Sequence, residues 1–339
     1  MTTARTLLQE RLISIVKRFP GRRILVVGDA IADQFVYGVI SRVSREAPVF
    51  ILRHEHTETV PGGAANCAMN LVSLGAGVSL IGVVGEDVAG RTLVERLETA
   101  GVDCTALLTS KKLQTTTKVR ILAGQLHSTR QQVIRLDYEG APLNSDFHEP
   151  LSKSILEEAQ TSDAVIISDY SYGVASQQVA GIVRDTATSK RIPVLVDSRS
   201  RLAEFKGFTS ATPNEDEVEQ LLGKQPAEVS DLESAGEEMR ERLGYRALLI
   251  TRGSLGMVLF QDAAAPVQID AVGAREPVDV TGAGDTVIAA YTLALASGAS
   301  FPDAARLANY AGGLVVMKRG TASVTGEELQ NSVLHSEST

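Results

Sequence analysis

The chain has 339 residues, of which 44% are hydrophobic and 22% are charged, as is usual for a globular protein with a buried core. Its 33 basic and 41 acidic residues give a net charge of −8, which argues against nonspecific nucleic-acid binding. Cys67 and Cys104 are too few for a disulfide framework or a zinc site. No apolar run is long enough for a transmembrane segment or a signal peptide, so we expect a cytoplasmic protein with no nucleic-acid or membrane partner.

The first predicted elements are a helix over residues 4–19 and a buried strand over residues 23–28. Apolar residues recur at helical spacing up to Phe19, and Pro20 with Gly21 ends that helix. The following run of four apolar residues is typical of a strand that is covered on both faces. Ligands gather at the carboxyl ends of such strands, so Asp29 and Asp33 are candidates for binding sugar hydroxyls. Capping of the next element explains these two aspartates equally well.

Two strand-rich segments, at about residues 34–58 and 113–139, interrupt the α/β pattern. Their partial alternation predicts short antiparallel strands that pair into a small separate sheet, a lid that excludes water from the site. The first segment contains His54-Glu55-His56, in which both histidines share one face of a strand. No third metal ligand is evident, so a surface strand is the favoured interpretation.

Between these segments, Gly62 and Gly63 precede a predicted helix that carries Asn66. The glycine pair permits close approach of the backbone to a ligand, and the Asn66 amide offers both a donor and an acceptor to a sugar hydroxyl. Tight packing at a helix start is the alternative.

The second half of the chain alternates predicted helices and strands. The helices cover residues 151–160, 177–190, 211–222 and 231–243, and the strands cover residues 163–169, 193–197 and 247–253. This order is typical of α/β proteins that have a parallel sheet. From about Gln330 the chain is polar, and we expect a frayed tail over residues 331–339.

The segment Asp279–Thr286 precedes a long apolar helix that should end near Gly298. Gly282, Ala283 and Gly284 therefore lie at a helix N-terminus, where free N–H groups and the helix dipole attract anions. Asp285 beside such a site could accept the proton of a hydroxyl that attacks a phosphoryl group. Simple capping of the helix by Asp285 is the alternative.

Five motifs in this order resemble the ribokinase/PfkB family of sugar kinases over about residues 22–328. They are Gly62–Asn66, Gly82–Gly90 (G-x-V-G-x-D-x-x-G), Asn214–Glu217 (N-x-x-E), Thr251–Gly256 (T-x-G-x-x-G) and Asp279–Asp285. The resemblance implies a ribokinase-like α/β fold, with a mostly parallel central sheet, helices on both faces and a small β lid. It also implies one kinase domain over residues 1–330 and a homodimer formed through the lid.

The same resemblance assigns roles to residues of this chain. It implies that Asp285 is the catalytic base and that the amides of Gly282, Ala283 and Gly284 form an anion hole. The residues implied for ATP are Asn214, Glu217, Thr251, Gly253, Gly256, Asn309 and Gly312. Asn214 and Glu217 would also hold Mg²⁺ through water, and K⁺ is a further implied cofactor. The residues implied for the sugar are Asp29, Asp33, Gly62, Gly63 and Asn66.

Within the family, the segments 41–49, 131–137 and 168–170 are most similar to kinases of D-glycero-D-manno-heptose 7-phosphate in ADP-heptose synthesis. The implied reaction moves the γ-phosphate of ATP to the anomeric hydroxyl. Tyr172 and Arg199 stand where those kinases usually carry lysine. Basic side chains that are candidates for a substrate phosphate are Lys118, Arg120, Arg130 and Arg199.

Other functions stay open at this point. A related kinase could act on ribose, fructose or a sugar acid, and a relative that binds sugar without catalysis is a further alternative. A dehydrogenase is disfavoured because no G-x-G-x-x-G follows the first strand.

Overall fold

The computed structural model describes residues 2–125, 130–140, 143–223, 229–273 and 276–335, and a seven-stranded sheet forms its centre. The strand order is β11-β10-β9-β1-β4-β5, β6 pairs with β4, and every pairing is parallel. The strands are β1 (Arg23–Gly28), β4 (Gly77–Gly85), β5 (Val102–Asp103), β6 (Leu107–Ser110), β9 (Ala164–Asp169), β10 (Val194–Ser198) and β11 (Ser210–Ala211). The predicted α/β fold with a mostly parallel sheet is therefore confirmed.

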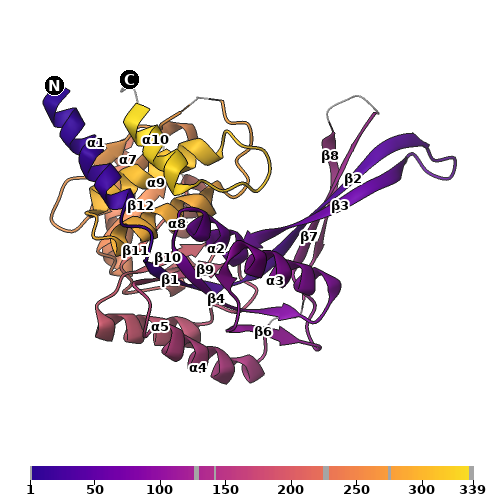
Figure 1. Cartoon of the computed structure of the whole chain (residues 1–339), viewed down its shortest axis with the longest axis horizontal. Coiled ribbons are helices and arrows are strands. Elements are labelled where there is room, and N and C mark those ends of the chain that lie inside the picture. Colours follow the sequence, from indigo (N-terminus) through magenta and orange to yellow (C-terminus); the bar gives the residue numbers. More distant parts are fainter. Residues whose placement is uncertain (1, 126–129, 141–142, 224–228, 274–275, 336–339) are drawn as a thin grey trace.

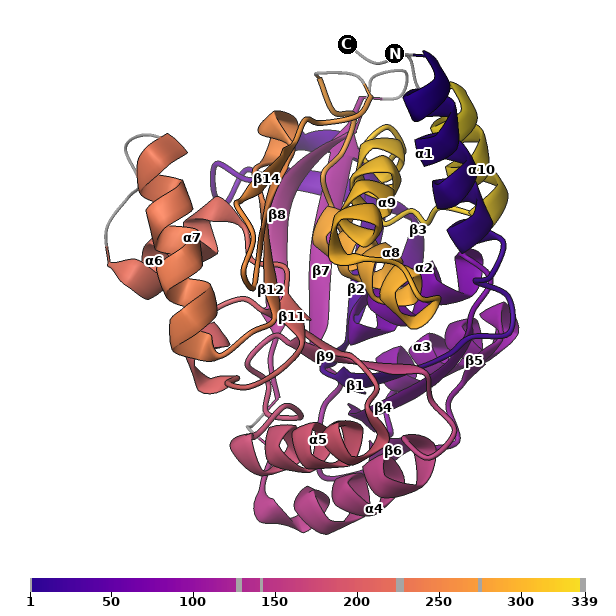
Figure 2. The same cartoon turned by 90° about the vertical axis from the view of Figure 1, so that its left-hand side faces the viewer.

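Helices cover both faces of this sheet, as the apolar sequence of β1 predicts. Ile24 and Val26 face one hydrophobic core, and Leu25 and Val27 face the other. The first core packs under α1 (Thr2–Val16), α2 (Ala64–Ser73), α3 (Val88–Ala100), α8 (Ala283–Ala296), α9 (Phe301–Val315) and α10 (Gly326–His335). The second packs under α4 (His148–Glu158), α5 (Gln177–Lys190), α6 (Glu215–Leu222) and α7 (Val229–Leu243). Figure 2 shows α4 and α5 on the side of the sheet opposite α8 and α9.

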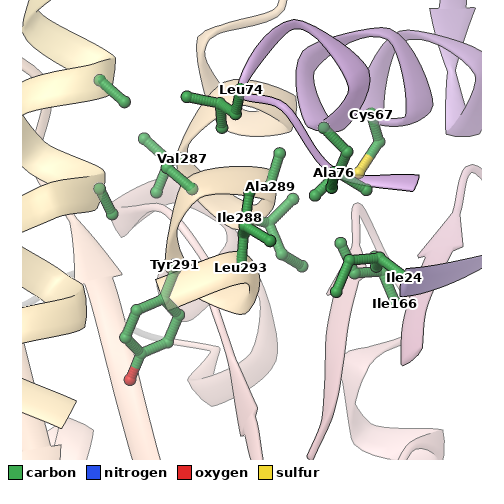
Figure 3. Close-up of a cluster of buried hydrophobic side chains, with 14 of the residues drawn as sticks. Ile24, Cys67, Leu74, Ala76, Ile166, Val287, Ile288, Ala289, Tyr291 and Leu293 are labelled. Atoms are coloured by element: carbon green, nitrogen blue, oxygen red, sulfur yellow. The ribbon is translucent and has the colours of Figure 1, made fainter. Parts of the chain in front are cut away.

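Helix α8 is the most deeply buried helix of the first core. Ile288 and Leu293 are fully buried, and Figure 3 shows them packed toward Cys67 of α2 and the strand residues Ile24 and Ile166. Burying one such side chain contributes about 1.5–3 kcal/mol to folding. The predicted buried helix is confirmed, and this packing fixes the position of its N-terminus.

A smaller antiparallel sheet contains β12 (Ala247–Thr251), β13 (Met257–Gln261) and β14 (Val267–Ile269). We expected residues 247–253 to continue the alternation of strands and helices, and the strand is present, but it pairs outside the main sheet. A single bridge between Asn214 and Thr251 joins β12 to the start of α6. Three short 3₁₀ helices complete the described elements: Ser145–Phe147, Leu202–Glu204 and Gly253–Leu255.

The two strand-rich segments form a separate four-stranded sheet that extends from the body as an arm (Figure 1). Its order is β3 (Phe50–Gly63), β2 (Ala30–Val43), β7 (Thr117–Gly124) and β8 (Gln131–Tyr138). The small separate sheet is confirmed, and we call it the lid sheet. The expectation of short, all-antiparallel strands is wrong: β2 and β3 have 14 residues each, and β2 pairs with β7 in parallel.

Helices α1 and α10 pack together beside the two chain ends (Figures 1 and 2). Leu329 and Val333 are fully buried, and the Gln9 side chain donates a 3.0 Å hydrogen bond to the Val333 carbonyl. The expectation of a frayed tail from Gln330 is therefore wrong as far as His335, because apolar residues at helical spacing anchor this segment. Residues 336–339 lie outside the described part of the chain. Among the described helices, none combines the length and apolar character needed to cross a bilayer.

Candidate functional site

A cavity of about 270 Å³ lies where the carboxyl ends of the central strands meet the base of the lid sheet. We call it the polar cavity because charged and polar side chains dominate its wall. Those side chains are Asp33, Asn66, Lys118, Arg120, Tyr170, Asp197, Arg199, Thr212, Asn214, Glu217, Thr251, Thr281, Asp285 and Thr321. The backbone of Gly62 and Gly63 completes the wall on the side of α2.

A second cavity of about 210 Å³ lies on the other side of the α8 N-terminus. We call it the apolar cavity. Its wall brings together residues that are distant in sequence and were predicted to share one site: Gly253, Gly256, Asn309 and Gly312. The Asn309 amide donates a 2.7 Å hydrogen bond to the Asp270 carbonyl, which fixes this side chain in the wall. Both cavities share Thr251, Val280, Ala283 and Gly284, so a ligand could extend from one cavity into the other.

Helix α8 begins in the wall between the two cavities. Gly282 is its N-cap residue, with φ 75° and ψ 9°, a left-handed conformation that favours glycine. The N–H of Ala283 donates to the Val280 carbonyl at 3.2 Å, so it is not free to bind an anion. The N–H groups of Gly282, Gly284 and Asp285 donate to no carbonyl among the described residues. The free N–H groups at this helix start are therefore those of Gly282, Gly284 and Asp285, and the Ala283 N–H of the predicted anion hole is already bonded.

Asp285 lies in the first turn of α8 and is 5% exposed. Its Oδ2 accepts a 2.6 Å hydrogen bond from the Asn66 amide, and its Oδ1 accepts a 3.0 Å hydrogen bond from the Tyr170 hydroxyl. Burial raises the pKa of Asp285 to about 6, and the two hydrogen bonds oppose that rise because they favour the charged form. A carboxylate with a pKa close to neutrality is suited to act as a general base.

Two further carboxylates, Asp197 and Glu217, lie in the wall of the polar cavity. Burial raises the pKa of Asp197 well above its ordinary value, and the negative charge of Asp285 adds to the rise. The Asp197 side chain forms no hydrogen bond or ion pair with a described residue. Burial also raises the pKa of Glu217, whose Oε2 accepts the Asn214 N–H at 3.0 Å.

The N-x-x-E motif has a local structural role as well as its place in the cavity. Oδ1 of Asn214 accepts the Glu217 N–H at 2.8 Å, so the two residues form a capping box at the start of α6. This reciprocal bonding fixes the backbone that presents Glu217 to the cavity.

The acidic pair fits Mg²⁺, which usually binds one or two protein carboxylates together with water and phosphate oxygens. Within the described ranges, no three histidine, cysteine or acidic residues are arranged to hold a metal by themselves. In the lid sheet, His56 stacks on Tyr37 at a centroid distance of 4.4 Å and His54 lies 2.9 Å from the Thr57 hydroxyl. The interpretation of these histidines as part of a surface strand is therefore confirmed.

The basic side chains of the polar cavity differ in their partners. Arg120 forms a 2.5 Å ion pair with Asp33, whereas Lys118 is buried without a carboxylate partner among the described residues. Burial lowers the pKa of Lys118, and the nearby Arg199 lowers it further. Arg130 pairs with Glu55 on the lid sheet and does not line the polar cavity, so the structure does not bring it to the site.

Asp29 does not line the polar cavity either. Its two carboxylate oxygens accept N–H groups from Tyr170 at 2.8 Å, Tyr172 at 3.1 Å and Val174 at 3.1 Å. This aspartate therefore holds the loop that follows β9, and the structure does not bring it to the cavity that Asp33, Gly62, Gly63 and Asn66 share. A carboxylate at a strand end looks the same in sequence whether it faces a ligand or a loop.

Comparison with known proteins agrees with this geometry. Residues 22–327 match the pfkB family carbohydrate kinase profile. The chain belongs to the PfkB family of carbohydrate kinases. It is therefore an ATP-dependent phosphotransferase whose acceptor is an alcohol group, and the predicted family is confirmed.

Two proteins that are similar to this chain in sequence are each named bifunctional protein HldE. The protein from Coxiella burnetii (strain Dugway 5J108-111) is 42% identical over 316 residues, which cover 92% of this chain and 63% of the relative. The protein from Marinomonas sp. (strain MWYL1) is 40% identical over 312 residues, covering 92% of this chain and 64% of the relative. The chain thus spans less than two thirds of the length of these relatives.

Solved structures of other kinases share the fold. Ribokinase from Arabidopsis thaliana complexed with ribose and ATP matches with a TM-score of 0.72 and 22% identity, covering 94% of this chain and all of that one. Phosphofructokinase-2 from Escherichia coli in complex with potassium matches with a TM-score of 0.77 and 20% identity, covering 93% of this chain and 98% of that one. These matches confirm the ribokinase-like fold.

The motifs of the PfkB family did not identify every residue of the polar cavity. Asp197 is the last residue of the strand predicted over residues 193–197, and this acidic strand end was a usable signal that sequence reasoning missed. Tyr170 lies in the segment 168–170 that resembles the heptose 7-phosphate kinases, but sequence reasoning gave it no role, and Thr212 and Thr321 gave no comparable signal.

Proposed function

We propose that this PfkB kinase transfers the γ-phosphate of ATP to the anomeric hydroxyl of D-glycero-D-manno-heptose 7-phosphate. The observation that carries the proposal is that one cavity contains both the Asp285 carboxylate and a buried, unpaired cation, Lys118. A neutral sugar offers such a cation no negative charge, whereas a phosphorylated sugar offers a charge-assisted hydrogen bond. The similarity to HldE proteins supports heptose as the sugar.

Asp285 accepts the proton of the attacking hydroxyl in this proposal. Asn66 and Tyr170 hold its two oxygens, so the carboxylate keeps one orientation. The free N–H groups of Gly282, Gly284 and Asp285, together with the α8 dipole, stabilise the negative charge at the phosphoryl group. General-base catalysis of this kind contributes roughly 10²–10⁴-fold to the rate.

The remaining wall residues hold the reactants. Asp33, Gly62, Gly63 and Asn66 would contact the sugar, and Arg199 would join Lys118 at its phosphate. Arg120 reaches the phosphate in this proposal only if its ion pair with Asp33 rearranges. The residues that would hold ATP are Thr251, Gly253, Gly256, Asn309 and Gly312.

Bound metal ions would neutralise phosphate charge, which is the chemistry they supply in phosphoryl transfer. Asp197 and Glu217, with Asn214 beside them, would hold Mg²⁺ through water. A potassium site is a further part of the proposal. The buried Thr321 hydroxyl, which has no partner among the described residues, supports it because a free oxygen can coordinate a cation.

We also propose a homodimer that forms through the lid sheet. On β8, Arg135 and Asp137 share the face that pairs with Arg120 and Lys118 of β7 and turns toward the cavity. The opposite face carries Ile134, Leu136 and Tyr138, all exposed. An exposed apolar patch of this kind marks an interaction surface. We further propose that the protein acts in the cytoplasm, where the two free cysteines would stay reduced.

A panel of acceptors tests the proposal. Purified protein with MgATP is assayed for ADP release against heptose 7-phosphate, the unphosphorylated heptose, ribose, fructose and fructose 6-phosphate, and the product is identified by ³¹P NMR. We expect heptose 7-phosphate to give the highest kcat/KM and an anomeric phosphate as product. A higher kcat/KM for a sugar without phosphate would overturn the acceptor, and no ADP release with any sugar would favour a non-catalytic relative.

Substitution of the unpaired cation sharpens this test. Lys118→Met should raise KM for the phosphorylated acceptor at least tenfold, the scale of one lost charge-assisted hydrogen bond, and leave KM for ATP unchanged. Lys153→Met, on the exposed face of α4, is the matched control and should change neither constant. An unchanged acceptor KM in Lys118→Met would contradict phosphate binding at this position.

A further inference from the structure

Tyr170 connects the proposed base to the cations of the polar cavity. Its hydroxyl donates to Oδ1 of Asp285 at 3.0 Å. The Arg199 guanidinium lies 4.9 Å from the centre of its ring, and the Lys118 ammonium lies 5.4 Å from it. A cation over an aromatic face withdraws electron density from the ring, so a phenol in this position is a stronger hydrogen-bond donor. Burial and the charge of Asp285 also raise the pKa of Tyr170, which keeps its hydroxyl protonated.

The loop that carries Tyr170 is held in an unusual conformation. Ser171 has φ 67°, a left-handed backbone that a serine rarely adopts. Asp29 accepts the N–H groups of three loop residues, and Asp169 accepts the Ser171 N–H at 3.2 Å and the Ser198 hydroxyl at 2.7 Å. Two buried carboxylates thus hold a strained segment in place. Such strain clusters where the position of a side chain matters for function.

We propose that Tyr170 is a positioning residue for phosphoryl transfer: its hydroxyl fixes the Asp285 carboxylate in the orientation and the ionised form that deprotonate the acceptor. This inference rests on the proposed function, because it assigns Tyr170 to the same reaction. Tyr170 acts through Asp285 and not on the acceptor itself. Asn66 supplies the second hydrogen bond to the carboxylate, so loss of Tyr170 leaves the base held at one oxygen only.

The charge environment of Asp285 comes from several elements that surround it. These groups are Asp33 of β2, Lys118 and Arg120 of β7, Asp197 of β10, Arg199 after β10 and Glu217 of α6. Substitution of Tyr170 by phenylalanine changes none of these charges. It removes only the hydroxyl, and the ring remains to pack and to face the two cations.

The test compares Tyr170→Phe with wild type in the full chain, with MgATP and the best acceptor, from pH 5 to pH 9. We expect kcat to fall roughly 10- to 100-fold, the scale of one lost hydrogen bond to a charged group, while KM for ATP stays within about twofold. The acid limb of the kcat profile should move to higher pH, because the hydrogen bond from Tyr170 lowers the pKa of Asp285. A purely structural role for Tyr170 would not shift this limb.

Tyr172→Phe is the matched control. Tyr172 belongs to the same loop and its ring also lies near Lys118, at 5.8 Å, but its hydroxyl donates to Glu139 and not to Asp285. We expect its pH profile to coincide with that of wild type. Thermal unfolding of both variants establishes that they fold.

A double variant separates action through Asp285 from an independent effect. If Tyr170 acts through the base, Tyr170→Phe should cause no further loss when added to Asp285→Asn. An additive loss, or a Tyr170→Phe profile identical to wild type, would overturn the inference. Failure of the proposed function gives a different result, since it would appear in wild type itself, as a preference for another acceptor or as no ADP release with any sugar, whereas failure of this inference appears only in the Tyr170 variants.

Discussion

The side-chain amide of Asn66 lies 2.6 Å from Oδ2 of Asp285, although 219 positions separate the two residues in the sequence. Each residue lies in the first turns of a helix that begins at a glycine with positive φ, Gly63 for α2 and Gly282 for α8. Two helix N-termini therefore meet at one carboxylate. Their dipoles both favour negative charge at this point, which suits a site that binds phosphate and holds an ionised base.

Two glycines of α8 should respond differently to the same added methyl group. A Cβ at Gly282 would lie 2.6 Å from the Asn66 amide nitrogen in a left-handed residue, so Gly282→Ala should destabilise the protein by about 1–2 kcal/mol and lower kcat. A Cβ at Gly284 meets nothing within 4 Å, so Gly284→Ala should fold at least as well as wild type. Its methyl group would nevertheless fill the anion site and raise KM for ATP. Thermal unfolding and ATP kinetics check both outcomes, and an unchanged KM in Gly284→Ala would contradict phosphate binding there.

Asp285→Asn should abolish most activity and stabilise the folded protein at neutral and higher pH. Burial raises the folded-state pKa of Asp285 from 3.8 to about 6, so the folded state binds more protons than the unfolded state between these values. Wild-type stability therefore falls as the pH rises through this range, by at most about 3 kcal/mol, since each pKa unit corresponds to 1.36 kcal/mol. Asparagine can still accept from Asn66 and donate to Tyr170, and it carries no charge to desolvate.

Urea unfolding of wild type and Asp285→Asn at pH 4 and pH 8 measures this effect. The two proteins should have similar stability at pH 4, and the variant should be more stable at pH 8. If the two proteins had equal stability at pH 4 and at pH 8, the ionised Asp285 carboxylate would not destabilise the folded state, contrary to the prediction.

Asp197→Asn should raise the Mg²⁺ concentration that gives half-maximal activity by about tenfold or more, since it removes one of two carboxylates available to the ion. Its stability without Mg²⁺ should not fall, because a buried carboxylate without a partner destabilises the folded state. Titration of activity with MgCl₂ provides the measurement. Glu215→Gln is the control: Glu215 lies in the first turn of α6 but pairs with Arg252 at 2.8 Å outside the cavity, and its Mg²⁺ dependence should match wild type.

Ile134→Lys should weaken the proposed dimer. The substitution places a charge on the apolar face of β8 without touching the face that carries Arg135 and Asp137. Leu156→Lys on α4 is a matched control, because both side chains are 49% exposed and only Ile134 belongs to the lid sheet. Sedimentation velocity should show monomers for Ile134→Lys and dimers for wild type and Leu156→Lys. A monomeric wild type would contradict the proposed assembly.

The order of helices and strands could be predicted from the sequence because local patterns encode it. Helix α5 has the predicted bounds, Gln177–Lys190, and Gly282 opens α8 as the glycine pattern indicated. The alternation of apolar and polar residues also predicted the lid sheet, but it did not predict the lengths of its strands. Strand β3 continues through Pro61 and the glycine pair, residues that normally interrupt a strand, because it pairs with β2 as far as Ala30 and Gly63.

The composition of the polar cavity depends on strand order, which local patterns do not encode. Tyr170 follows β9 and Asp197 lies near the carboxyl end of β10, and both are near Asp285 because β9 lies between β1 and β10 in the sheet. Asp29 shows the opposite case: it follows β1 at the correct edge, yet its carboxylate faces the loop after β9. The sequence predicts that each residue lies at the carboxyl edge of the central sheet. Only the folded structure determines which of these side chains faces the polar cavity.

The long strands β2 and β3 extend from the wall of the polar cavity to the outer end of the lid sheet. Asp33 and Gly62 contribute to the cavity wall at its inner end, and Val43 and Phe50 pair at its outer end (Figure 1). At about 3.3 Å per residue, a 14-residue strand spans roughly 45 Å. The register shifts at Tyr37/Gly38 and Ile40/Arg42 are the places where the ladder bends most easily. The outer half of the β2–β3 pair can therefore bend at these bulges while the inner half keeps its position. Entry and release of the sugar then need not move Asp285.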